Sequence, residues 1–176
     1  MGRENRKSGP GGPPDRGGPS KQVFPRPSRR QEMVVFVGLP RSGKSTFIDR
    51  HFFHYQILCP DDVRRGLGVR HDRRLEPYVW SVVEAQGRDV LERGRSLVVD
   101  ATNTTEAARR RWIDLAREYD CPLRLIWVDT PLEVCLERAG ESDFPANVLL
   151  RMQDQLRQYP PDPQSSDYTL EIVGTL

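Results

Sequence analysis

Lys44 and Ser45 close a run of residues whose types and spacing suit the binding of a polyphosphate. The run extends from Gly38 to Ser45 and has the sequence G-L-P-R-S-G-K-S, which matches the phosphate-loop pattern G-x-x-x-x-G-K-[S/T]. The two glycines let the backbone turn tightly and approach a phosphate closely. Lys44 supplies a point charge for the β- and γ-phosphates of ATP, and the Ser45 hydroxyl is the kind of oxygen ligand that Mg²⁺ prefers.

The residues on either side of this loop strengthen the interpretation. Residues 33–37 are apolar and mostly β-branched, and residues 45–50 are compatible with a helix. Strand, glycine-rich loop and helix form the setting in which backbone N–H groups and a helix start create an anion site. The predicted ATP-binding residues in the loop are Gly38, Pro40, Arg41, Ser42, Gly43, Lys44, Ser45 and Thr46, and Ser45 is also the predicted metal ligand. The alternative is a simple glycine-rich turn between a strand and a helix.

Two carboxylates and an arginine follow the next short apolar run, residues 56–59. The sequence continues Pro60-Asp61-Asp62-Val63-Arg64-Arg65. Proline suits the first position of a helix and acids suit its first turn, so a helix is predicted to begin here. A carboxylate near a γ-phosphate can accept the proton of an attacking hydroxyl, which makes Asp61 a candidate general base. Arg64 lies three residues on, so it shares a helix face with Asp61; helix capping by Asp61 and Asp62 is the alternative.

A third group of polar residues follows another apolar run. Residues 96–100 are predicted to form a strand that ends in the carboxylate of Asp100, and Thr102 and Asn103 come directly after it. These two side chains offer hydrogen bonds to a polar substrate. Arg109 and Arg111 on the next predicted helix could hold an acceptor phosphate, and a solvated helix face is the alternative for both.

The elements that must position these residues alternate between strand and helix. Five strand patterns are separated by helical patterns, which predicts an α/β fold with one parallel five-stranded sheet and helices on both faces. In such sheets ligands bind beyond the carboxyl ends of the strands. The predicted strands are 33–37, 56–59, 96–100, 123–128 and 168–173, and the longer predicted helices are 75–93, 131–138 and 146–158, with another starting near 106.

Charge and composition divide the chain at about residue 32. Residues 1–32 hold eight Lys/Arg and three Asp/Glu, a net of +5, together with six glycines and six prolines. Residues 33–176 hold nineteen Lys/Arg and twenty-two Asp/Glu, a net charge of −3. We predict that residues 1–32 are a disordered basic tail, because they cannot bury enough apolar surface to offset the entropy of ordering. This tail could attract nucleic acid or act only as a solubilising extension. Residues 33–176 would form the catalytic domain.

The sequence carries no sign of secretion or membrane insertion. It shows no N-terminal apolar targeting segment and no run of 18 apolar residues. Three cysteines without C-x-x-C spacing argue against a disulfide framework and for a cytoplasmic protein. His51 and His54 are spaced like zinc ligands, but no second ligand pair accompanies them, so packing or solvation is the preferred interpretation.

Several motifs together resemble a known family. Residues 33–173 look like the phage-type polynucleotide kinases and their P-loop kinase relatives, AAA-type ATP-binding kinases. The resemblance is carried by G-L-P-R-S-G-K-S-T, C-P-D-D-V-R, V-V-D-A-T-N, V-C-L-E-R and F-P-A-N-V-L-L-R-M. It implies phosphorylation of a 5′-hydroxyl with ATP and Mg²⁺. It assigns the general base to Asp61, contact with the acceptor phosphate or transition state to Arg64, and a place in the acceptor site or near the metal's water shell to Asp100.

The lid segment departs from the family pattern. Relatives usually carry several basic residues there, whereas residues 138–145 contain Arg138 as the clearly basic one, with Glu141 and Asp143 beside it. Arg138 is therefore the predicted lid contact to ATP, and Arg151 could compensate. Three functions stay open: a kinase for the 5′-hydroxyl of a nucleic acid or oligonucleotide, a small-molecule kinase for a nucleoside, nucleotide, sugar or antibiotic, and a non-catalytic ATP-binding module.

Overall fold

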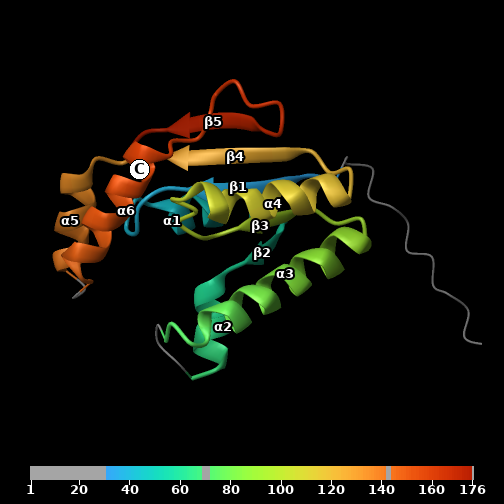
Figure 1. Cartoon of the computed structure of the whole chain (residues 1–176), viewed down its shortest axis with the longest axis horizontal. Helices are drawn as coiled ribbons and strands as arrows, with labels where there is room; N and C mark the ends of the chain where they lie inside the picture. Colours follow the sequence, from blue (N-terminus) through green and yellow to red (C-terminus); the bar gives the residue numbers. More distant parts are fainter. Residues whose placement is uncertain (1–30, 69–71, 142–143, 176) are drawn as a thin grey trace, which may run out of the picture.

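Five parallel strands form a single sheet in the described part of the chain. The computed structural model describes residues 31–68, 72–141 and 144–175. Within them the strands lie side by side in the order β2-β3-β1-β4-β5 (Figure 1). Their bounds are β1 Met33–Val37, β2 Gln56–Leu58, β3 Leu97–Val99, β4 Leu123–Val128 and β5 Thr169–Val173. The predicted α/β fold with one parallel five-stranded sheet is therefore confirmed.

The six helices of the described residues cover the two faces of the sheet unequally. Their bounds are α1 Lys44–His51, α2 Pro60–Gly66, α3 Glu76–Glu92, α4 Glu106–Glu118, α5 Leu132–Gly140 and α6 Ala146–Gln158. Crossovers between parallel strands are right-handed, and only the β1-to-β2 crossover runs toward the β2 edge of the sheet. That connection places α1 on one face, and the other connections place α2 to α6 on the opposite face.

Burial follows this division. Every residue of β1 is fully buried. Successive side chains of β1 point to opposite faces, so Val34 and Phe36 pack with Ile48 of α1, whereas Val35 and Val37 belong to the larger cluster under α3 to α6. Both faces of the central strands are thus covered, which explains why β1, β3 and β4 are near-continuous runs of apolar residues rather than alternating ones.

Local sequence signals set several helix starts as predicted. Pro60 is the first residue of α2, with acids in the first turn. Thr105 caps α4, because its side chain accepts a hydrogen bond from the backbone N–H of Ala108 at 3.2 Å. The predicted strand 56–59 was one residue too long, because Cys59 is the residue that precedes α2. The predicted helix 131–138 was also shifted: α5 spans Leu132–Gly140.

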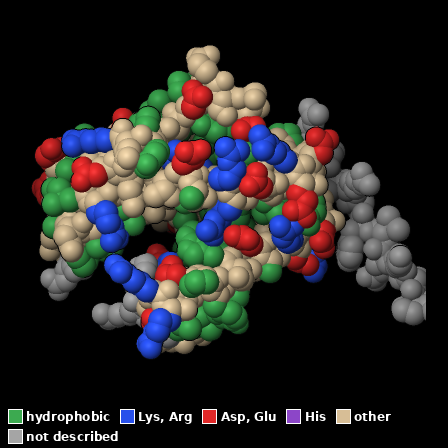
Figure 2. Space-filling view, in the orientation of Figure 1, with side chains coloured by type: hydrophobic (Ala, Val, Ile, Leu, Met, Phe, Trp, Pro, Cys, Tyr) green, Lys and Arg blue, Asp and Glu red, His purple; other side chains and the backbone are tan. Residues whose placement is uncertain are grey.

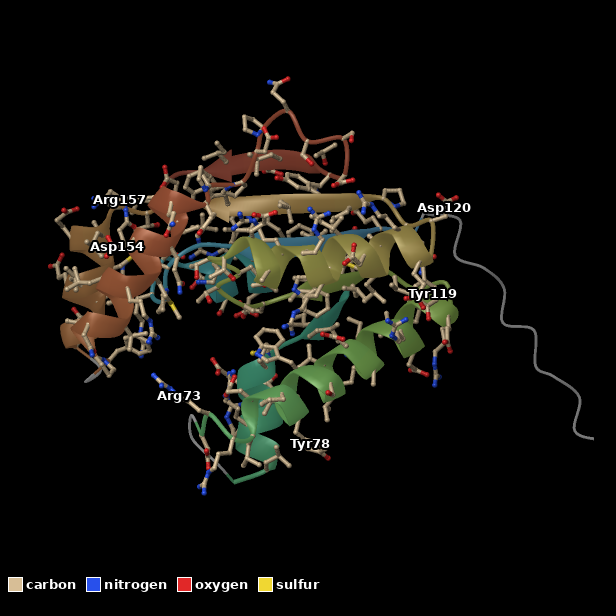
Figure 3. The ribbon with its side chains drawn as sticks, viewed as in Figure 1. Arg73, Tyr78, Tyr119, Asp120, Asp154 and Arg157 are labelled. Atoms are coloured by element: carbon tan, nitrogen blue, oxygen red, sulfur yellow. The ribbon has the colours of Figure 1, made fainter. Side chains whose placement is uncertain are left out.

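The carboxyl ends of the strands meet at one edge of the sheet, where Figure 2 shows a hollow between α5–α6 and α2–α3. Figure 3 shows Arg73, just before α3, pointing toward the α5–α6 side of this hollow. Most of the predicted basic tail lies outside the described residues, and the tail itself stays a prediction. Gln31 is described, and its side chain bonds the carbonyl of Leu91 at 2.8 Å. In the described segments, no helix has the length and hydrophobicity needed to cross a membrane.

Candidate active site

The phosphate loop leaves β1 at Gly38 in a conformation that favours glycine. Gly38 has φ 147°, and a Cβ there would lie 2.7 Å from the backbone oxygen of Val128 at the end of β4. Its N–H donates to the backbone oxygen of Thr102 at 3.0 Å. The loop therefore passes between the ends of β3 and β4, and the first glycine of the motif is fixed by this close approach.

The loop then curls around its own backbone before α1 begins. Arg41 and Gly43 both have positive φ, 66° and 102°, and α1 starts at the next residue, Lys44. The N–H of Ser42 donates to Leu39 O at 3.2 Å, and the hydroxyl of Thr130 donates to Ser42 O at 2.8 Å. This tight turn in front of a helix start gives the backbone N–H groups the arrangement of an anion-binding nest.

Lys44 is folded back onto the loop. It is 7% exposed, and its ammonium donates to Leu39 O at 2.6 Å, to Gly38 O at 3.2 Å and to the Ser42 hydroxyl at 3.4 Å. Burial lowers the pKa of Lys44 to about 8, and negative charges including those of Asp100 and Asp61 partly oppose that shift. A triphosphate in the loop would bring negative charge to this buried ammonium, which suits the role predicted for Lys44.

Ser45 and Asp100 meet across the ends of β1 and β3. The Ser45 hydroxyl donates to Asp100 Oδ2 at 2.8 Å. Burial raises the pKa of Asp100, while the hydrogen bond from Ser45 and the charge of Lys44 hold it down. A hydroxyl and a carboxylate side by side next to a phosphate loop are oxygen donors of the kind that Mg²⁺ takes, so these two residues fit the predicted metal site.

Asp61 and Arg64 form a pair on α2, as their spacing predicts, and a third residue joins them. Arg64 Nη1 lies 2.5 Å from Asp61 Oδ1. Arg64 also binds Glu76 of α3 with two nitrogens, Nε at 2.8 Å and Nη2 at 2.6 Å. Arg64 is 9% exposed, whereas the side chain of Asp61 is 67% exposed. Asp62 is also exposed and bonds Arg65, so it belongs to a separate surface pair.

The loop after β3 is held from within the protein. Asn103 is 3% exposed and adopts φ 44°. Its side-chain N–H donates to the Phe36 carbonyl of β1 at 2.7 Å, and its Oδ1 accepts from the indole N–H of Trp112 at 3.1 Å. The substrate role predicted for Asn103 stays a prediction; here its amide ties the loop to β1, which leaves Thr102 and Asp100 as the nearer candidates for substrate contact.

The two arginines of α4 have different surroundings. Arg109 is 5% exposed and donates to Asn103 O at 3.1 Å and to Tyr159 O at 2.7 Å, so it braces α4 against the end of α6. Arg111 stacks on the ring of Trp80, with 4.4 Å from its guanidinium carbon to the ring centroid, and lies 3.2 Å from Glu84. Arg109 therefore has an internal role, whereas the side chain of Arg111 is 31% exposed and its predicted alternatives stay predictions.

The lid reaches the phosphate loop through Arg138. Its Nη1 donates to the backbone oxygen of Arg41 at 3.1 Å, which places α5 next to the loop. Arg41 in turn lies 6.0 Å from the ring of Phe144, just before α6. Arg138 is thus brought to the predicted ATP site, whereas the exposed Arg151 lies on α6 and Asp143 of the lid lies outside the described residues.

Sequence reasoning missed two residues that shape the site, Glu76 and Thr130, and misplaced a third, Arg109. Glu76 carried no motif, although its place at the start of a predicted helix resembles that of Asp61. Thr130 follows Asp129, the acid just after β4, and its hydroxyl bonds Ser42 O; a hydroxyl just beyond a strand end was an available signal. Arg109 was singled out as a surface residue, and nothing in the local sequence marks it as buried. For metal binding by other groups, the described residues contain no cluster of three or more His, Cys, Asp or Glu.

Comparison with known proteins agrees with this geometry. The family model described as AAA domain matches residues 33–159. The bifunctional polynucleotide phosphatase/kinase of Schizosaccharomyces pombe is 33% identical over 107 residues, which cover 61% of this chain and 23% of that protein. The L-seryl-tRNA(Sec) kinase of Methanococcus maripaludis is 26% identical over 132 residues, which cover 70% of this chain and 51% of that protein. The chain therefore matches only part of each of these relatives.

A solved structure shares the fold. A putative kinase from Chloroflexus aurantiacus superposes with a TM-score of 0.65 at 17% identity, and the alignment covers 84% of this chain and 89% of that one. At this identity the likeness concerns the arrangement of strands and helices and leaves the acceptor open.

Proposed function

This chain belongs to the AAA domain family and is a P-loop kinase, and we propose that its acceptor is the 5′-hydroxyl of a nucleic acid or oligonucleotide. The observation that carries transfer to a hydroxyl is the exposed carboxylate of Asp61 on α2, and the choice of a nucleic acid as the acceptor rests on the two observations given below. It lies at the same edge of the sheet as the phosphate loop, and its negative charge acts to raise the pKa of both Lys44 and Asp100. A hydroxyl held between α2 and the loop after β3 would lie between a proton acceptor and the phosphate loop, as in-line transfer requires.

Each site residue has one proposed role. Lys44 and the N–H groups of the loop bind the β- and γ-phosphates of ATP, and Arg138 approaches them from the lid. Ser45 and Asp100 would hold Mg²⁺ or its water shell; the bound ion would neutralise charge on the phosphates. Asp61 accepts the proton of the attacking hydroxyl, and Arg64 stabilises negative charge beside it.

Two further observations support a nucleic acid as the acceptor. The 33% identical relative is named for polynucleotide kinase activity, although this chain matches 23% of its length. Arg73 lies just before α3 and points toward the α5–α6 side of the hollow at the carboxyl edge (Figure 3). A guanidinium group beside an open hollow suits the phosphates of a nucleic acid better than a neutral sugar.

One observation favours the second candidate, a small-molecule kinase. Without the basic tail, residues 33–176 carry a net charge of −3, and this charge disfavours binding of a long polyanion. The two candidates share the residues that activate the hydroxyl and bind ATP, and they differ in the acceptor alone.

A matched pair of variants tests the proposed chemistry. Asp61→Asn keeps the shape of the side chain and removes its basicity, so transfer of γ-phosphate from ATP to a 5′-hydroxyl oligonucleotide should fall by about 10²–10⁴, with ATP binding retained. Asp62→Asn makes the same change one residue away, in a pair exposed to solvent, and should have little effect. Equal losses in the two variants, or a larger loss in Asp62→Asn, would show that Asp61 is not the base.

A further inference from the structure

Arg64 joins three parts of the site that the sequence treats as separate. It lies in α2, bonds Asp61 one turn earlier on the same helix, and bonds Glu76 at the first position of α3. A guanidinium has five N–H groups. Within the described residues Glu76 takes two of them, through Nε and Nη2, and Asp61 takes one, through Nη1.

The two carboxylates hold Arg64 in different ways. Asp61 binds one nitrogen, and its side chain stays 67% exposed. Glu76 binds two nitrogens in a fork, and its side chain is 28% exposed. A two-point bond fixes the plane of a guanidinium, whereas a one-point bond leaves it free to rotate. The orientation of Arg64 is therefore set mainly by α3 and not by its own helix.

We propose that Glu76 is a positioning residue for phosphoryl transfer, which fixes the guanidinium of Arg64 so that Nη1 faces Asp61 and the incoming hydroxyl. This inference rests on the proposed function, because it takes Asp61 as the base and Arg64 as the cation beside it. In this role Glu76 acts through Arg64, which it binds at Nε and Nη2. The hydrogen bond from Arg64 to Glu76 also raises the pKa of Arg64.

The position of the pair explains why the bond must cross between helices. α2 is seven residues long and ends at Gly66, so it offers little packing of its own to hold an arginine. α3 is seventeen residues long and is anchored in the core through Val79, Val83 and Val90. Glu76, at the start of α3, therefore holds Arg64 of the short helix α2 against the longer helix. An error of about 1 Å in the placement of a catalytic group can cost of order 10² in rate.

The test compares Glu76→Gln with a matched change on the same helix. Asp89→Asn also neutralises an acid of α3 that bonds an arginine, here the exposed Arg93. With a single-stranded 5′-hydroxyl oligonucleotide as acceptor, kcat/KM for the acceptor should fall by about 10- to 100-fold in Glu76→Gln. The KM for ATP should stay within about twofold of wild type. Asp89→Asn should match wild type, and Glu76→Asp, which keeps the charge, should recover part of the loss.

A double-mutant cycle separates positioning from a general structural role. Arg64→Lys leaves a point charge that cannot bind Glu76 through a fork. If Glu76 acts through Arg64, Glu76→Gln should cost little more once Arg64→Lys is present, so the two losses should be far from additive. Additive losses would overturn the inference, as would a KM for ATP that rises as much as the KM for the oligonucleotide.

The outcomes distinguish this inference from the function on which it rests. A wild-type enzyme that labels the oligonucleotide, together with a Glu76→Gln variant equal to Asp89→Asn, would refute the positioning role and leave the kinase proposal standing. A wild-type enzyme that labels no oligonucleotide would refute the proposed acceptor. The role of Glu76 in transfer to that acceptor would then be refuted as well. Thermal melting of each variant shows whether a loss of rate reflects unfolding.

Discussion

The buried charge of Lys44 lowers the free energy of unfolding, and removing the charge should reveal this effect. Burial lowers the pKa of Lys44 from 10.5 to about 8. The unfolded chain therefore binds this proton more tightly than the folded chain, so the cost is fully present below pH 8 and disappears as the pH rises through 10.5. At about 1.4 kcal/mol for each tenfold change, it amounts to roughly 3 kcal/mol at pH 7.

Lys44→Met removes this charge but also removes useful hydrogen bonds. The ammonium bonds the carbonyls of Leu39 and Gly38, and losing these bonds costs about 1–2 kcal/mol. Without nucleotide, Lys44→Met should therefore be more stable than wild type by about 1–2 kcal/mol at pH 7. Near pH 10.5 the charge penalty has gone and only the lost bonds remain, so the variant should be the less stable protein.

Two assays check this change of sign. Urea unfolding at pH 7 and pH 10.5 gives the free energy of unfolding of both proteins, and Ser45→Ala, which removes no proton that titrates in this range, is the control. The chain has only three lysines, Lys7, Lys21 and Lys44, so an NMR titration of ¹³C-labelled lysines can measure the pKa of Lys44 directly. A variant that is less stable at pH 7, or a Lys44 resonance that titrates near 10.5, would refute the reasoning.

Three other changes test neighbouring parts of the site. Gly38→Ala places a Cβ 2.7 Å from Val128 O, so ATP affinity should fall at least tenfold in calorimetric titration; unchanged affinity would show that the loop can relax. Asn103→Asp loses the donor that bonds β1 and should lower the free energy of unfolding by about 1–3 kcal/mol in urea, and an unchanged midpoint would contradict the bracing role. Deletion of residues 1–30 should leave the fold intact and raise the KM for oligonucleotide most at low salt, where attraction to phosphates is strongest; a KM that rises equally at all salt concentrations would argue against electrostatic attraction by the tail.

The fold could be predicted from sequence because its signals are local. The strands under both layers of helices are continuous apolar runs, and Pro60 and Thr105 mark helix starts within one turn. The rule that ligands bind at the carboxyl ends of parallel strands then brought Asp61 and Asp100 to the same edge as the phosphate loop. These steps need only the pattern of each segment and the handedness of its connections.

The details of the site depend on contacts between distant residues, and those could not be predicted. Arg109 is buried because Tyr159, 50 residues away, offers it a backbone carbonyl. Asn103 faces inward because the Phe36 carbonyl and the Trp112 indole complete its hydrogen bonds. Glu76 reaches Arg64 only because α3 packs beside α2. A polar residue near a strand end has the same sequence signature whether it binds substrate or braces the loop.

The central claim is transfer of the γ-phosphate of ATP to a nucleic-acid 5′-hydroxyl, and one measurement tests it most directly. Purified wild-type protein is incubated with γ-³²P-labelled ATP and Mg²⁺ in parallel with 5′-hydroxyl oligonucleotides, 5′-phosphorylated oligonucleotides, nucleosides and sugars, and Asp61→Asn serves as the blank. We expect label on the 5′-hydroxyl oligonucleotides and none on their 5′-phosphorylated counterparts. Labelled sugars or nucleosides with unlabelled oligonucleotides would contradict the proposed acceptor, and release of inorganic phosphate without any labelled acceptor would contradict the kinase account itself.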